Sequence, residues 1–130
     1  MNEDLYPSPS RDLSRLRRNL APEAAAAFHD FGKAVFADGA LSTKTKHIIA
    51  VAVAHVTQCP YCIKGHTRAA LGEGASEQEL MEAIWVAAEM RAGAAFAHSV
   101  IALAEMNATK PAAANGNASA NLENREQHAH

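Results

Sequence analysis

The order of apolar and polar positions along the chain predicts helices joined by short polar turns. The alanine-rich segment 22–38 places Phe28, Phe31 and Phe36 at spacings that suit one face of a helix. Gly39 follows directly and is well placed to end that helix, because glycine adopts the left-handed backbone at low cost. The segment is therefore expected to form one amphipathic helix.

Capping signals mark the two helices that follow. Ser42 is a favourable N-cap for a helix over 43–57, whose apolar run IIAVAVA would by composition also suit a buried strand. Its length and its cap favour a helix. Pro60 suits the first turn of the next helix, over 60–71, because the missing N–H of proline is not needed there. Cys59 is the expected N-cap of that helix.

A long helix is predicted in the second half of the chain. Gly72 and Gly74 end the preceding helix, and the run Ser76-Glu77-Gln78-Glu79 has the pattern of a capping box. The helical pattern then continues to about Met106, with a possible break at Gly93. Together these segments predict an all-α fold, a compact helical domain of about five helices.

Three regions are distinguished by composition. Residues 1–20 contain turn signals and a basic cluster, which predicts a solvated N-terminal arm or a short helix lying on the body. Residues 21–107 form the helical domain. Residues 108–130 have almost no large apolar side chains, so a disordered tail is expected. The apolar helices offer more hydrophobic surface than one small bundle covers, which predicts an oligomer.

Composition and charge narrow the function classes. The net charge of −2 gives no indication of a nucleic-acid partner. No stretch approaches the ~20 uninterrupted apolar residues of a membrane span, so no membrane partner is expected. The N-terminus begins with acidic residues and lacks the apolar run of a secretory signal. A cytoplasmic location follows as an expectation.

Both cysteines of the chain lie in one Cys59-Pro-Tyr-Cys62 tetrapeptide, and His66 follows one helical turn later. In a reducing compartment this spacing indicates redox chemistry or metal binding rather than a structural disulfide. Cys62 is expected in the first turn of its helix, where unpaired N–H groups favour the thiolate, so its pKa should lie below the ordinary ~8.5. His66 can add positive charge or accept the thiol proton.

The expected chemistry is stepwise. The Cys62 thiolate attacks a peroxide and becomes a sulfenic acid, and Cys59 condenses with it to form a disulfide that a reductant reopens. Two other readings stay open: the cysteines could serve as small apolar core residues, or Cys59, Cys62, His55 and His66 could bind zinc. Ligands crowded on consecutive turns of one helix do not surround an ion well. No metal or other cofactor is therefore expected.

The stretch 41–97, with CPYCIKGH followed by GAS-x-x-E, resembles the alkyl hydroperoxidase D core domain of the carboxymuconolactone decarboxylase family. The resemblance implies an all-α fold that assembles into homotrimers or homohexamers, and peroxidase activity with an intramolecular disulfide. It assigns the sulfenic acid to Cys62. Cys59 is assigned proton donation, resolution of the sulfenic acid and possible mixed disulfides with a partner, and His66 is assigned a proton relay.

The chain departs from the resembled family at the position twelve residues before the first cysteine. The well-studied hydroperoxidases have a relay glutamate there, and this chain has His47. The relay is then expected either to be rebuilt from His47, His55 and His66 or to be impaired. His55 and His98 could equally be core histidines bonded to backbone carbonyls. Glu89 is either a buried relay carboxylate or a solvent-facing residue.

These observations together predict an oxidoreductase with an antioxidant role, a thiol-dependent peroxidase. Its expected partners are a peroxide substrate and an unidentified thiol or dithiol reductant. Two alternatives remain at this point: a carboxymuconolactone decarboxylase-type lyase, and a non-enzymatic thiol redox sensor. The lyase reaction does not require a Cys-x-x-Cys pair, which favours the redox interpretation.

Overall fold

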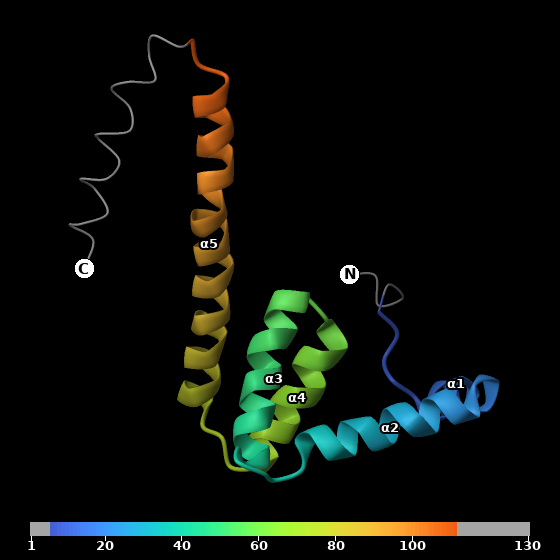
Figure 1. Cartoon of the computed structure of the whole chain (residues 1–130). Helices are drawn as coiled ribbons and strands as arrows, with labels where there is room; N and C mark the ends of the chain where they lie inside the picture. Colours follow the sequence, from blue (N-terminus) through green and yellow to red (C-terminus); the bar gives the residue numbers. More distant parts are fainter. Residues whose placement is uncertain (1–5, 112–130) are drawn as a thin grey trace.

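The computed structural model describes residues 6–111, and this part of the chain contains helices and no strands (Figure 1). The helices are α1 (Arg11–Leu20), α2 (Pro22–Phe36), α3 (Thr43–Thr57), α4 (Pro60–Gly72) and α5 (Glu77–Ala108). The prediction of an all-α fold with about five helices is confirmed. The predicted disordered tail falls almost wholly outside the described residues. The basic N-terminal cluster lies in α1, so the short-helix alternative describes this segment.

Local capping groups set where the helices begin. The Ser42 hydroxyl accepts the Thr45 N–H at 3.1 Å, and Cys59 and Pro60 open α4 as expected. The Ser76 hydroxyl accepts the Glu79 N–H at 3.0 Å, and the Glu79 carboxylate accepts the Ser76 N–H at 3.0 Å. Both halves of the predicted capping box are therefore present.

Two predicted features differ from the structure. The possible break at Gly93 is absent, and α5 runs unbroken through it. A single glycine costs a helix only about 1 kcal/mol, and good helix formers on both sides offset that cost. The helix predicted over 22–38 ends earlier, at Phe36, because the extended backbone of Ala37 begins the turn before Gly39 does.

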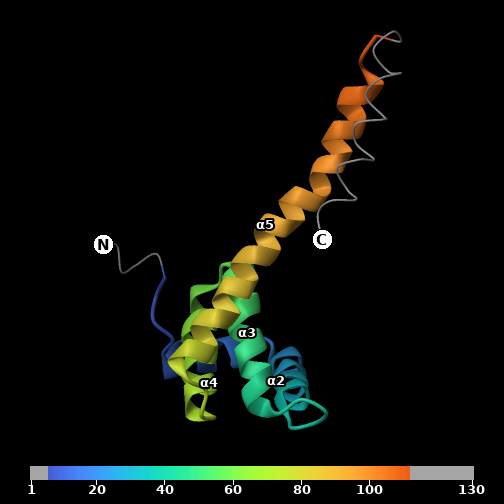
Figure 2. The same ribbon diagram turned by 90° about the vertical axis from the view of Figure 1, so that its left-hand side faces the viewer.

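The core is small and lies where α3 packs against both α4 and the first half of α5 (Figures 1 and 2). Small side chains let the three helices approach closely. The Arg91 guanidinium also donates to the Val56 carbonyl at 3.0 Å, which ties α5 to the end of α3. The buried cluster and the side chains packed on it are Val51, Ala70, Ala75, Leu80, Ile48 and Ile84.

The rest of the molecule is open, so one chain does not close into a compact bundle. The arm formed by α1 and α2 projects to one side, and the second half of α5 extends beyond α3 and α4 (Figure 1). Both parts expose large apolar side chains: Phe28 is 75% exposed and Phe96 is 82% exposed. By length and composition alone, α5 is long and apolar enough to cross a membrane, and core helices of soluble proteins meet the same criterion. Glu89 and Arg91 interrupt its apolar run.

Candidate active site

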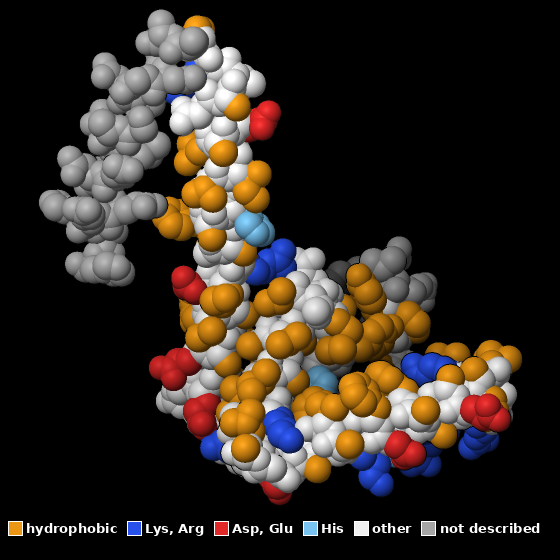
Figure 3. All heavy atoms as spheres, viewed as in Figure 1, with side chains coloured by type: hydrophobic (Ala, Val, Ile, Leu, Met, Phe, Trp, Pro, Cys, Tyr) orange, Lys and Arg blue, Asp and Glu red, His pale blue; other side chains and the backbone are white. Residues whose placement is uncertain are grey.

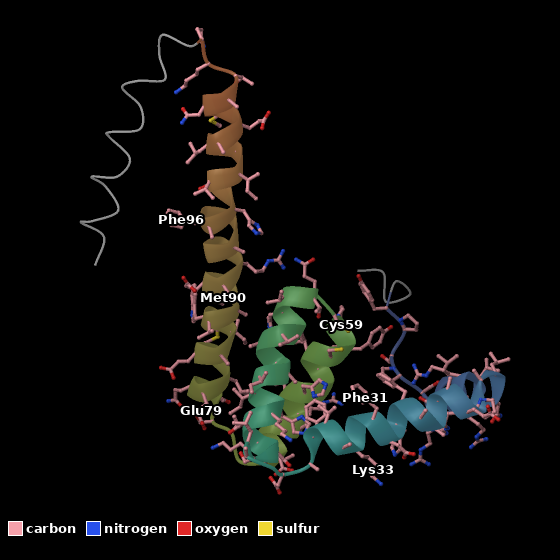
Figure 4. The ribbon with its side chains drawn as sticks, in the orientation of Figure 1. Phe31, Lys33, Cys59, Glu79, Met90 and Phe96 are labelled. Carbon is pink, nitrogen blue, oxygen red and sulfur yellow. The ribbon has the colours of Figure 1, made fainter. Side chains whose placement is uncertain are left out.

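The turn between α3 and α4 places the cysteine pair at the start of a helix. Gln58 adopts the left-handed backbone (φ 58°, ψ 43°) and ends α3, and the Cys59 N–H then donates to the Ala54 carbonyl at 3.2 Å. Cys59 becomes the N-cap of α4, and its Sγ accepts the Cys62 N–H at 3.4 Å. Figure 4 shows Cys59 at this end of α4. Both cysteines are free thiols and half-buried.

The electrostatics of the pair favour a thiolate at Cys59 over one at Cys62. Its pKa lies below the ordinary thiol value, first because the Cys62 thiol donates a hydrogen bond to it and then because the Cys62 N–H does. The same hydrogen bond raises the pKa of Cys62, and burial and the neighbouring charge raise it further. The prediction of a lowered pKa at Cys62 is therefore wrong for the reduced pair. The N–H groups of the first turn point at the N-cap side chain, so their field acts on Cys59.

Two histidines from different helices meet one turn along α4 from Cys62. The Nδ1 atom of His47, in α3, lies 3.1 Å from the Nδ1 atom of His66, in α4. Phe36 stacks on both rings, with centroid distances of 4.6 Å to His47 and 5.1 Å to His66. His66 also follows Cys62 by one turn of α4. The structure thus brings together His47 and His66, two of the predicted relay residues, and adds an aromatic cover.

The corner between α2 and α3 holds Phe36 over the histidines. The Thr43 hydroxyl donates to the Phe36 carbonyl at 2.8 Å, and the Thr43 N–H donates to the Asp38 carboxylate at 2.8 Å. This backbone hydrogen bond is the main reason that the pKa of Asp38 lies below its ordinary value. The Lys46 ammonium donates to the Ala37 carbonyl. The start of α3 is therefore pinned to the end of α2.

The protonation of the histidine pair follows from its geometry. Two Nδ1 atoms at hydrogen-bond distance share one proton, since one ring must donate and the other accept. Burial lowers the pKa of His66, and the neighbouring His47 lowers it further. His66 therefore remains a neutral imidazole, able to accept a proton, at pH values where an ordinary histidine is already protonated.

The other predicted relay residues lie elsewhere. The Nδ1 atom of His55 is 2.7 Å from the Val51 carbonyl one turn earlier, which fits the backbone-bonded alternative rather than a relay. His98 is exposed on α5, so it is not a core histidine. Glu89 is exposed as well, and the solvent-facing interpretation describes it. Within residues 6–111, no group of three or more metal-ligating side chains is positioned to hold an ion.

Two neighbours of the site were not predicted as such. Phe36 was expected only as one residue of an apolar helix face, and nothing local indicates that it stacks on His47. The Tyr61 hydroxyl, inside the Cys-x-x-Cys, donates to the Pro7 carbonyl at 2.8 Å, and its ring meets that of Tyr6 edge to face at 6.3 Å. The N-terminal segment therefore lies against the first turn of α4.

Proteins of known sequence resemble this chain over most of its helical part. An uncharacterised protein of the cox locus of Paracoccus denitrificans is 64% identical over 81 residues, which cover 62% of this chain and 73% of that protein. An uncharacterised protein of Cupriavidus necator is 36% identical over 87 residues, which cover 67% of this chain and 77% of that protein.

Two solved structures share the fold. A carboxymuconolactone decarboxylase family protein from Legionella pneumophila is 37% identical with a TM-score of 0.57, covering 61% of this chain and 70% of that one. A protein from Methanobacterium thermoautotrophicum is also 37% identical, with a TM-score of 0.61, covering 64% of this chain and 93% of that one. The sequence profile of the carboxymuconolactone decarboxylase family matches residues 22–105. The chain belongs to the carboxymuconolactone decarboxylase family.

Proposed function

We propose that this protein is a thiol-dependent peroxidase in which Cys59 and Cys62 are oxidised to a disulfide by a hydroperoxide. The family includes alkylhydroperoxidase-like members and decarboxylases. The observation that carries the proposal is the cysteine pair at the start of α4, in which the thiol of Cys62 donates to Cys59 and lowers its pKa. A pair that loses its first proton easily supplies a thiolate at neutral pH.

The two thiols act as one unit in this proposal. The resting charge lies on Cys59, and transfer of the shared proton from Cys62 to Cys59 generates the Cys62 thiolate. Its Sγ bonds to the terminal peroxide oxygen, the O–O bond breaks, and the leaving alkoxide takes the proton of Cys59 to become an alcohol. Cys62 is then a sulfenic acid, and Cys59 is a thiolate again.

The disulfide forms in the next step. The Cys59 thiolate attacks Sγ of Cys62, the S–O bond breaks, and the departing hydroxide takes a proton to become water. A dithiol reductant reopens the disulfide by thiol–disulfide exchange and is itself oxidised. Cys59 is the better placed thiol for that exchange because its pKa is lowered. The location of these steps in the cytoplasm remains a prediction.

The histidine pair supplies the proton path. His66 accepts the first proton lost by the thiol pair, which its lowered pKa permits at neutral pH, and later returns it to the hydroxide. The 3.1 Å contact with His47 lets the two rings pass this proton between them. His47 thus has the role that the relay glutamate has in the resembled hydroperoxidases. A lyase of the decarboxylase type would leave both thiols without a role.

The proposal is tested by single-turnover oxidation of the reduced protein with one equivalent of hydrogen peroxide. The wild-type protein is expected to lose both thiols as water is formed. Cys59→Ser should stop at a sulfenic acid on Cys62, trapped with dimedone and located by mass spectrometry. Cys62→Ser should react far more slowly. His66→Gln should slow the first step by roughly 10²–10⁴-fold, the usual contribution of a proton acceptor.

Each cysteine variant is the control for the other. A sulfenic acid trapped on Cys59, with Cys62 unreactive, would reverse the two roles while leaving the peroxidase in place. Thiols that remain unoxidised in the folded wild-type protein would contradict the proposed function.

A further inference from the structure

A groove of about 890 Å³ lies between α1 and α2 and reaches α3 at His47. Its volume is within the range of pockets that bind small organic molecules. Alanines and the rings of Phe28 and Phe36 form its apolar lining. Figure 3 shows hydrophobic side chains along the side of the arm that faces α3 and α4.

The charge of the groove is unlike that of the whole chain. Arg17, Arg18 and Lys33 line it, and no aspartate or glutamate of residues 6–111 does, although the chain carries a net charge of −2. Among the described residues none of these three cations is in an ion pair; the ion pair that the structure shows there joins Lys44 and Glu79. An apolar groove that also carries cations outside any ion pair suits a ligand that combines a hydrocarbon chain with an anionic group.

The groove also reaches one member of the histidine pair. His47 is one of its lining residues and lies 3.1 Å from His66, which follows Cys62 by one turn of α4. Arg17 and Arg18 lie in α1, outside residues 22–105 that the family profile matches. Two of the three cations of the groove therefore lie outside the segment that the family profile matches, and Lys33 lies inside it.

We propose that the groove binds the substrate, and that the substrate is the hydroperoxide of an aliphatic carboxylic acid. The carboxylate lies at Arg17 and Arg18, and the hydrocarbon chain lies on Phe28 and Phe36. The hydroperoxide end is directed toward His47. The inference deepens the proposed function and rests on it for the reaction, whereas the binding of the acid can be measured without any peroxide.

Binding is tested by titration calorimetry of the full reduced chain at pH 7, with octanoate as the probe and octan-1-ol as its uncharged counterpart. Octanoate is expected to bind, and octan-1-ol at least about tenfold more weakly, because a charge-assisted hydrogen bond contributes about that factor. The double variant Arg17→Gln/Arg18→Gln should weaken octanoate binding about tenfold or more. Lys33→Gln, a single change on the exposed side of α2, should weaken octanoate binding severalfold. It replaces the double variant in this test if circular dichroism shows that the double variant is misfolded.

Arg11→Gln/Arg15→Gln is the matched control. It removes the same charge from the same helix at positions that do not line the groove, so octanoate binding should change less than twofold. Absence of octanoate binding, equal binding of octan-1-ol, or equal weakening by the two arginine pairs would each overturn the inference.

Turnover separates this inference from the proposed function. In Arg17→Gln/Arg18→Gln, the ratio of kcat/KM for a fatty-acid hydroperoxide to kcat/KM for hydrogen peroxide should fall about tenfold, as binding does. An unchanged ratio in an active enzyme would overturn the substrate assignment and leave the peroxidase standing. Arginine-dependent octanoate binding with thiols that resist every peroxide would support the binding site and contradict the proposed function.

Discussion

The packed hairpin of α3 and α4, with the first half of α5, differs sharply from the α1–α2 arm and the second half of α5. In the hairpin Val51 and Ala70 are fully buried, and Arg91 and the Ser76 capping box fix the neighbouring helix. In the open regions the helices are equally regular, yet Phe28, Phe31 and Phe96 are mostly exposed. Regular backbone and buried side chains are therefore separate properties of this molecule.

The difference shows what the open regions lack. Helical hydrogen bonds are satisfied within each helix, so the backbone of the arm and of the end of α5 needs no neighbouring segment as a hydrogen-bond partner. Their apolar side chains do need one, because large exposed apolar surfaces are rare on soluble monomers. We propose that further copies of the chain cover the end of α5 and Phe31 on the arm, which does not line the groove. The homotrimer or homohexamer implied by the family resemblance remains a prediction.

The largest effect is expected on self-association. Phe96 and Val100 are one turn apart on the same face of α5, and charging both with Phe96→Asp/Val100→Asp should shift the protein from an oligomer toward the monomer. The measurement is multi-angle light scattering at micromolar concentration. His98→Asp adds a charge on the other side of the same turn and should change the mass less. A wild-type protein that is monomeric under these conditions would contradict the proposal that further copies of the chain cover the exposed apolar side chains.

A smaller effect on stability distinguishes buried from exposed apolar residues. Val51→Ala removes two methyl groups from a site that is 0% exposed and should lower the free energy of unfolding by about 2 kcal/mol. Val86→Ala makes the same change where the side chain is 60% exposed. The two variants gain the same helix propensity, so their difference in urea denaturation reports burial alone. Equal losses would show that a partner covers Val86 in solution.

The smallest effect concerns the pH dependence of stability. Because the pKa of His66 is lower in the folded chain than its ordinary value of 6.5, the unfolded chain binds the proton more readily. The contribution of His66 is therefore fully present above about pH 6.5 and is lost as the pH falls toward and through its lowered pKa. His66→Gln should flatten this limb in denaturation midpoints measured from pH 7.5 to 5. His98→Gln, a substitution of an exposed histidine on α5, is expected to leave it unchanged.

Local sequence signals, such as capping residues and helix-face patterns, predicted helices in both regions. Ser42, Pro60 and the Ser76 capping box placed three helix starts correctly, because a cap satisfies N–H groups within three residues of itself. The Cys-x-x-Cys and the histidine one turn later were likewise readable, since one turn of helix fixes their neighbourhood. Gly93 was misjudged because a helix tolerates a lone glycine whose neighbours favour helix.

Only the tertiary structure decided which distant groups meet. His47 and His66 are brought to 3.1 Å, and Phe36 is stacked on both, by the packing of α3 on α4 and by the corner that Thr43 closes. The sequence named both histidines but could not show their contact, because it depends on where two separate helices cross. The lowered pKa of Cys59 differs from these contacts because its causes are local: Cys59 is the N-cap of α4, and the thiol and the N–H of Cys62, three residues later, both donate to it. Such an N-cap is visible in the sequence, whereas the meeting of His47, His66 and Phe36 is not, because that depends on how separate helices pack.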